Sequence, residues 1–122
     1  MENLRNFYSN KNVLVTGGHG FKGSWLCLAL NYFGSNVLSY GLINSSSLDF
    51  HNALRRKKRE IIFIEGNILD KIKLNKSIKE FKPDIVFHLA ADPLVSSGYE
   101  RPYSMFETNI MGSVSILEAC IQ

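Results

Sequence analysis

Residues 13–23, VLVTGGHGFKG, contain the local signals that decide the fold. The stretch opens with a β-branched apolar run that stops at a glycine pair, which is typical of a buried strand ending at a turn. Glycines recur at every third position after that, and an apolar helical pattern begins before the stretch is over. This succession predicts a strand over 12–16, a glycine-rich turn, and a helix over 21–33 with Gly34 at its C-terminal cap.

Three glycines of this turn meet the requirements of an anion site. Gly17 lets the chain turn sharply off the strand, Gly20 lets backbone N–H groups approach a pyrophosphate, and Gly23 lets the helix pack closely on the sheet. The helix N-terminus then presents unpaired N–H donors and a partial positive charge to the anion. A purely structural turn is the alternative, but the strand before and the helix after favour dinucleotide binding. A phosphate-loop NTPase is excluded because Lys22 precedes the glycine that it would have to follow.

Outside this stretch, apolar runs and helical patterns alternate. Four strands alternating with helices predict a Rossmann-like, doubly wound α/β fold with a parallel sheet covered on both faces, in a single domain over residues 1–122. Ligands in such sheets bind at the carboxyl ends of the strands, here after residues 16, 42, 65 and 88. The other predicted strands are 36–42, 61–64 and 84–89, and the other predicted helices are 71–81, stopped by Pro83, and 103–120.

Side-chain patterns predict which helix faces are buried. Phe21 and Trp25 are expected in the core, on the sheet side of the first of these helices. In the last helix, a stripe is expected to face the sheet, with Met105 and Ile116 lying off it. The stripe consists of Phe106, Ile110, Val114, Leu117 and Ile121.

Composition excludes several classes of function. The chain has 122 residues, of which 45% are hydrophobic, and a net charge of +3, which is too small to indicate nucleic-acid binding by itself. The basic run Arg55–Arg59 is either an RNA or targeting patch or, as we expect, a solvated helix end and loop. No stretch approaches the roughly 18 apolar residues of a membrane span, so a cytoplasmic protein is expected. Cys27 and Cys120 lie far apart and outside any ligand cluster, which predicts reduced, buried thiols and no metal site.

Three motifs carry a resemblance to a known family. The TGxxGFxG spacing resembles the extended short-chain dehydrogenase/reductase (NAD-dependent epimerase/dehydratase) family, and so do His88–Ala91 (HLAA) and Thr108–Gly112 (TNIMG). Within the family, Gly20–Leu26 (GFKGSWL) and Asp92–Val95 (DPLV) resemble CDP-glucose 4,6-dehydratases, whose second stretch reads QPLV. The resemblance covers nearly the whole chain and implies the N-terminal, cofactor-binding part of a longer enzyme.

The resemblance implies NAD as cofactor and assigns its contacts. It places the pyrophosphate at the glycine turn, the adenine at Asn67–Ile68, where the family has an aspartate, and the nicotinamide ribose beside Ala90 and Ala91. The strand over 36–42 ends without a carboxylate for the ribose diol, so Asn44 is a candidate substitute, and the absence of an arginine there gives no support for NADP. The candidate cofactor-binding residues are Gly17, Gly20, Phe21, Lys22, Gly23, Asn44, Asn67, Ile68, Leu89, Ala90 and Ala91.

No catalytic residue is assigned. The resemblance implies a Tyr-x-x-x-Lys pair for proton transfer, and the sequence contains none. His19, expected to be exposed to solvent or to the cofactor, and His88, expected to close a buried strand, are both interpreted as structural rather than as acids or bases.

Three functions remain open at this level. The first is the NAD-binding portion of a nucleotide-sugar dehydratase that converts CDP-glucose to its 4-keto-6-deoxy product, inactive alone and, when complete, a homodimer that binds the nucleotide sugar. The second is a non-catalytic dinucleotide-binding module. The third is another sugar-nucleotide epimerase or reductase of the same family.

Overall fold

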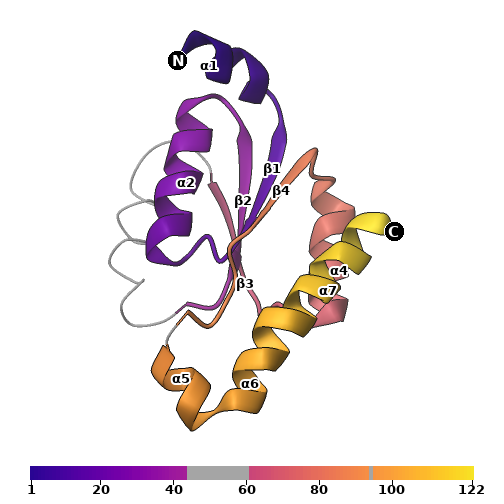
Figure 1. Cartoon of the computed structure of the whole chain (residues 1–122). Coiled ribbons are helices and arrows are strands. Elements are labelled where there is room, and N and C mark those ends of the chain that lie inside the picture. The colour runs from indigo at the N-terminus through magenta and orange to yellow at the C-terminus, as the bar shows by residue number, and fades with distance from the viewer. Residues whose placement is uncertain (44–60, 94) are drawn as a thin grey trace.

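The computed structural model describes residues 1–43, 61–93 and 95–122. A central parallel sheet lies between helices on its two faces, and the short helices that follow the last strand lie beyond one end of the sheet (Figure 1). In chain order the elements are α1 (Glu2–Tyr8), β1 (Asn12–Thr16), α2 (Phe21–Tyr32), β2 (Asn36–Gly41), β3 (Ile61–Glu65), α4 (Lys71–Phe81), β4 (Ile85–His88), α5 (Val95–Glu100), α6 (Pro102–Phe106), the π-helical turn η1 (Glu107–Met111) and α7 (Gly112–Ile121).

The sheet has the order β3-β2-β1-β4, and every described strand pair is parallel. The chain moves outward from β1 through β2 to β3 and then crosses back to place β4 on the other side of β1. The strand order therefore reverses beside β1, and parallel α/β sheets bind ligands at the carboxyl ends of the strands where the order reverses. The predicted α/β class and its parallel sheet are confirmed.

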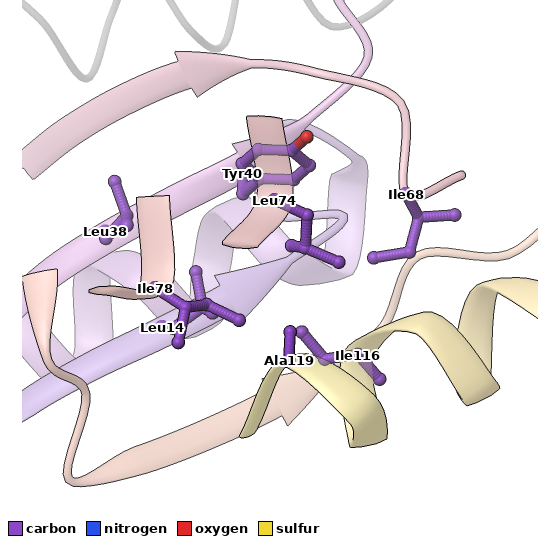
Figure 2. Packing of buried hydrophobic residues seen from close by; sticks show 8 residues of the cluster. All are labelled: Leu14, Leu38, Tyr40, Ile68, Leu74, Ile78, Ile116 and Ala119. Atoms are coloured by element: carbon purple, nitrogen blue, oxygen red, sulfur yellow. The ribbon is translucent and has the colours of Figure 1, made fainter. Parts of the chain in front are cut away.

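Alternate residues of the strands build two separate hydrophobic cores, since successive side chains of a strand point to opposite faces. Leu14, Leu38 and Tyr40 pack with residues of α4 and α7 on one face (Figure 2). Val13, Val15 and Val37 pack on the other face with Cys27 and Leu30 of α2. Both faces of the sheet are therefore covered, as the near-continuous apolar strands predict.

The helix ends follow local chemistry. Gly34 has a φ of 91° immediately after the C-cap of α2, where a residue with a side chain would be strained. Asp70 caps α4 by accepting a hydrogen bond from the backbone N–H of Lys73 at 3.0 Å. Lys82 closes the same helix in a left-handed conformation just before Pro83. The bounds of α2 and α4 consequently match the sequence prediction closely.

The C-terminal prediction was wrong in two respects. The segment that the sequence predicts as a single helix over 103–120 is interrupted by the π-helical turn η1, and α5 precedes it. The predicted sheet-facing stripe is exposed, with Leu117 at 63% and Ile121 at 85%, whereas Ile116 is 4% exposed and belongs to the core. The other buried residues of α7, Gly112, Ser115 and Ala119, are small, and a side chain at Gly112 would overlap Ile68. Close packing through small residues therefore determines which face of α7 lies against the sheet.

The prediction that Phe21 and Trp25 of α2 lie in the core was also wrong, again because small residues pack closely on the sheet side. Phe21 and Trp25 are exposed at 78% and 55%, and the buried residues of this helix are small or aliphatic: Gly23, Ser24, Cys27 and Leu30. A Cβ at Gly23 would overlap the backbone of Gly17, so the helix lies too near the turn for an aromatic ring to fit between them.

His19 and Cys120 also differ from expectation. His19 is 2% exposed rather than open to solvent, because its ring packs against β2 and β3, where Nδ1 lies 3.1 Å from the Ser39 hydroxyl and the ring meets Phe63 edge-on. Cys27 is buried as predicted, but Cys120 is exposed on α7. The basic run Arg55–Arg59 lies outside the described residues.

Candidate functional site

A pocket of about 660 Å³ opens at the carboxyl ends of the strands. Every predicted cofactor-binding residue lines this pocket except Asn44, which lies outside the described residues. The lining residues that the sequence did not single out come from the same strand ends and from η1: Tyr40, Gly41, Leu42, Gly66, Pro93 and Thr108. Thr108 lies in the TNIMG motif, so the motif marked the segment but not this residue's place in the pocket.

Two glycines of the loop are required by the protein's own packing. Gly17 has a φ of 70°, and a Cβ there would lie 2.8 Å from the backbone nitrogen of Ala90. A Cβ at Gly23 would overlap the carbonyl oxygen of Gly17. These residues therefore let the loop pass close to both β4 and α2.

Gly20 is different, and it supplies the test of whether a cofactor fits. Its φ of –77° and ψ of 173° suit any residue. Among the described residues, an added Cβ would meet only the Gly17 carbonyl oxygen, at 3.3 Å. Gly20 is exposed and lines the pocket. A side chain there would fill space at the helix N-terminus that the described residues leave open. A pyrophosphate fits such a cradle.

The electrostatics of the pocket favour an anion. The first-turn N–H groups of α2 have no intrahelical acceptor, and they point toward the helix N-terminus where Gly20 and Phe21 line the pocket. Among the described lining residues, Lys22 is the only charged side chain, and none is a carboxylate. An anionic group at this helix end is therefore stabilised, and no described lining residue repels it.

At the end of β3, Asn67 is held by its neighbours. Its Oδ1 accepts a hydrogen bond from the backbone N–H of Leu69 at 2.9 Å, and its carbonyl oxygen accepts one from the Tyr40 hydroxyl at 3.1 Å. Burial, with a smaller effect from the charge of Asp70, raises the pKa of Tyr40 to about 12, so this phenol remains a hydrogen-bond donor at neutral pH. The Asn67 side-chain NH₂ makes no hydrogen bond within the described part of the chain and can donate to a ligand.

At the end of β4, two successive N–H groups are held by Thr16. The Leu89 N–H donates to the Thr16 carbonyl oxygen at 3.0 Å, and the Ala90 N–H donates to the Thr16 hydroxyl at 3.3 Å. The same hydroxyl lies 2.6 Å from Nδ1 of His88. His88 is thus tied to the backbone of the pocket wall through the Thr16 hydroxyl.

The described residues contain no group of three or more side chains suited to hold a metal ion. In the same part of the chain, no helix is both long and apolar enough to cross a membrane.

Comparison with known proteins identifies the family. The family model described as GDP-mannose 4,6 dehydratase matches residues 14–122. The chain belongs to the NAD-dependent epimerase/dehydratase family. Within this family, the CDP-glucose 4,6-dehydratase of Salmonella typhimurium is 45% identical over 118 residues, which cover 97% of this chain and 33% of that protein.

Solved structures of the family share the fold. An epimerase from Methanothermobacter thermautotrophicus is 33% identical with a TM-score of 0.83, over 98% of this chain and 34% of that one. A UDP-glucose-4-epimerase from Stenotrophomonas maltophila, solved with bound NAD, is 30% identical with a TM-score of 0.79, over 90% of this chain and 33% of that one. The chain thus spans about a third of the length of these family members.

Proposed function

We propose that this chain is the NAD-binding portion of a nucleotide-sugar 4,6-dehydratase whose substrate is CDP-glucose. The observation that carries the proposal is the cradle at Gly20, where the described residues leave space beside unpaired helix N–H donors. The 45% identity to a CDP-glucose 4,6-dehydratase supports the substrate, and the NAD bound in a related epimerase supports the cofactor.

Each part of the pocket has a role in this proposal. The pyrophosphate lies against the glycine loop and the first turn of α2, with Phe21 and Lys22 beside it. Asn67 and Ile68 contact the adenine, and the Asn67 NH₂ donates to a ring nitrogen where an aspartate would accept. Leu89, Ala90 and Ala91 lie beside the nicotinamide ribose. Asn44, outside the described residues, remains a candidate for the ribose diol of the adenosine.

NAD supplies the hydride acceptor for oxidation of the sugar, and this chain's residues bind and orient the cofactor. The sequence contains no Tyr-x-x-x-Lys pair for the accompanying proton transfer. The 122 residues by themselves are therefore expected to bind NAD without turning over a sugar nucleotide.

An epimerase is the second candidate. The two solved structures compared above are an epimerase and a UDP-glucose-4-epimerase, and they share the fold at 33% and 30% identity. The higher identity of the dehydratase favours dehydration.

Calorimetric titration with NAD tests the binding proposal. Gly20→Val is expected to abolish detectable binding while circular dichroism and thermal unfolding stay close to those of the wild type, because its backbone angles suit valine. Gly23→Val is the matched comparison and is expected to lose the fold, since its side chain would overlap the Gly17 backbone. Unchanged NAD affinity in a folded Gly20→Val protein would contradict the site.

Incubation of the chain with CDP-glucose and NAD tests the second half of the proposal. No 4-keto product is expected above a control without protein, since the proton relay is missing. Product that increases in proportion to protein concentration would show that other residues replace the tyrosine pair.

A further inference from the structure

A chain of hydrogen bonds joins β1, β4 and the C-terminal helical segment beneath the pocket wall. Nδ1 of His88 lies 2.6 Å from the Thr16 hydroxyl, and Nε2 of the same ring lies 3.2 Å from the Ser113 hydroxyl. The Ser113 hydroxyl in turn donates to the carbonyl oxygen of Asn109, one turn earlier, at 2.9 Å. His88 therefore lies between the strand end and the π-helical turn.

These hydrogen bonds connect the two anchors, the points at which the segment after β4 is held. At one end, Thr16 accepts the N–H groups of Leu89 and Ala90. At the other end, the Asn109 side chain accepts from the Asp92 N–H at 2.8 Å and donates to its carbonyl oxygen at 3.1 Å. The wall that includes Leu89, Ala90 and Ala91 is held at both ends, and His88 ties the two anchors together.

The donor and acceptor in each of these hydrogen bonds follow from the other partners of the same groups. A carbonyl oxygen can only accept a hydrogen bond, so the Ser113 hydroxyl donates its proton to the Asn109 carbonyl oxygen. The Ser113 oxygen must then accept a hydrogen bond from Nε2–H of His88. In the neutral ring Nδ1 then carries no proton and accepts a hydrogen bond from the Thr16 hydroxyl, whose oxygen in turn accepts one from the Ala90 N–H. Of the two neutral tautomers, only the one with its proton on Nε2 satisfies all of these contacts.

We propose that His88, as the neutral Nε2–H tautomer, is a positioning residue that holds the Leu89–Ala91 wall in register with η1 and so sets the affinity for the half of the dinucleotide beyond the pyrophosphate. The inference rests on the proposed NAD function. It assigns no proton transfer to His88, whose ring contacts the protein on both nitrogens. Burial, which lowers the pKa of His88, agrees with the neutral form.

The first test needs no ligand. Nitrogen-15 NMR of the histidine-labelled chain at neutral pH distinguishes a protonated from a bare ring nitrogen, and His88→Gln identifies the signals of residue 88. A protonated Nε2 with a bare Nδ1 is the expected result. A proton on Nδ1, or fast exchange between the two tautomers, would overturn the inference whether or not the chain binds NAD.

The second test compares two serines of α7. Ser113→Ala removes the acceptor of His88, while Ser115→Ala removes a hydroxyl that donates to the Met111 carbonyl at 2.9 Å and has no histidine partner in the described structure. Ser113→Ala is expected to lower the affinity for NAD about three- to tenfold, which is the effect of one lost hydrogen bond, and to leave the affinity for ADP unchanged. Ser113→Thr, which keeps the hydroxyl, is expected to restore wild-type affinity for NAD.

ADP is the informative probe because it contains the adenosine and both phosphates but lacks the half that lies against Leu89–Ala91 in the proposal. The positioning role would be overturned if Ser113→Ala lowered the affinities for NAD and ADP equally, or if Ser115→Ala lowered the affinity for NAD as much. Either result would mean that the Ser113 hydroxyl contributes only to the stability of the fold. A wild-type chain that binds neither nucleotide would overturn the proposed function and the positioning together, whereas the NMR result still decides the tautomer.

Discussion

Glycines at three positions of one loop meet three different requirements. Gly17 adopts a positive φ and passes close to Ala90, Gly23 lets α2 approach the loop, and Gly20 has neither constraint. The same residue type therefore marks a turn, a packing contact and a space for a ligand within seven residues of sequence. Backbone geometry and neighbouring atoms separate these uses, and only the last is specific to binding.

Burial of His88 predicts that the stability of the chain depends on pH. Burial lowers its pKa in the folded chain below the ordinary value of 6.5, so the unfolded chain binds a proton more readily. The free energy of unfolding is therefore expected to be greatest above about pH 6.5 and to fall as the pH decreases through the lower folded pKa. Urea unfolding at a series of pH values measures this. In His88→Gln the dependence should flatten over the same range, and an equally steep curve in that variant would assign it to other groups.

At the scale of elements, small residues decide which helix faces meet the sheet. Gly112, Ser115 and Ala119 let α7 approach, with Ile116 between them in the core, while Leu117 points to solvent. A π-helical turn precedes this helix, and it shifts the helical phase relative to a continuous α-helix. Hydrophobic periodicity alone therefore selected the wrong face.

Paired substitutions in α7 check this packing. Ile116→Ala is expected to lower the free energy of unfolding by about 2–5 kcal/mol, because it leaves a cavity in the core. Leu117→Ala, at a side chain that is 63% exposed, is expected to change it by less than about 0.5 kcal/mol. Denaturant titration of both variants gives the comparison, and a larger loss for Leu117→Ala would mean that the sequence stripe packs on the sheet after all.

Considered as a whole, the molecule has two surfaces that favour association. β4 pairs only with β1 among the described strands, so one edge of the sheet has unpaired backbone groups. The large apolar residues of the C-terminal helices that are half exposed or more include Phe106, Ile110, Leu117 and Ile121. Exposed apolar patches on a protein surface commonly mark an interface.

The chain is therefore predicted to self-associate through these surfaces. Sedimentation velocity at about 100 µM is expected to show species larger than a monomer. Leu117→Lys should shift the distribution toward monomer, whereas Ile72→Lys, at an 85% exposed apolar residue of α4, should not. A stable wild-type monomer at this concentration would count against the prediction.

The sequence by itself determined the strand, the glycine turn and the helix at 12–33, the parallel α/β class, and the strand ends at which the pocket opens. These features depend on local backbone preferences and on apolar periodicity, which are properties of short segments. Only the tertiary structure decided that His19 is buried, that Phe21 and Trp25 are exposed, and that Ile116 rather than Leu117 enters the core. These outcomes depend on how closely a helix approaches the sheet, and that distance is set by small residues from segments far apart in the chain.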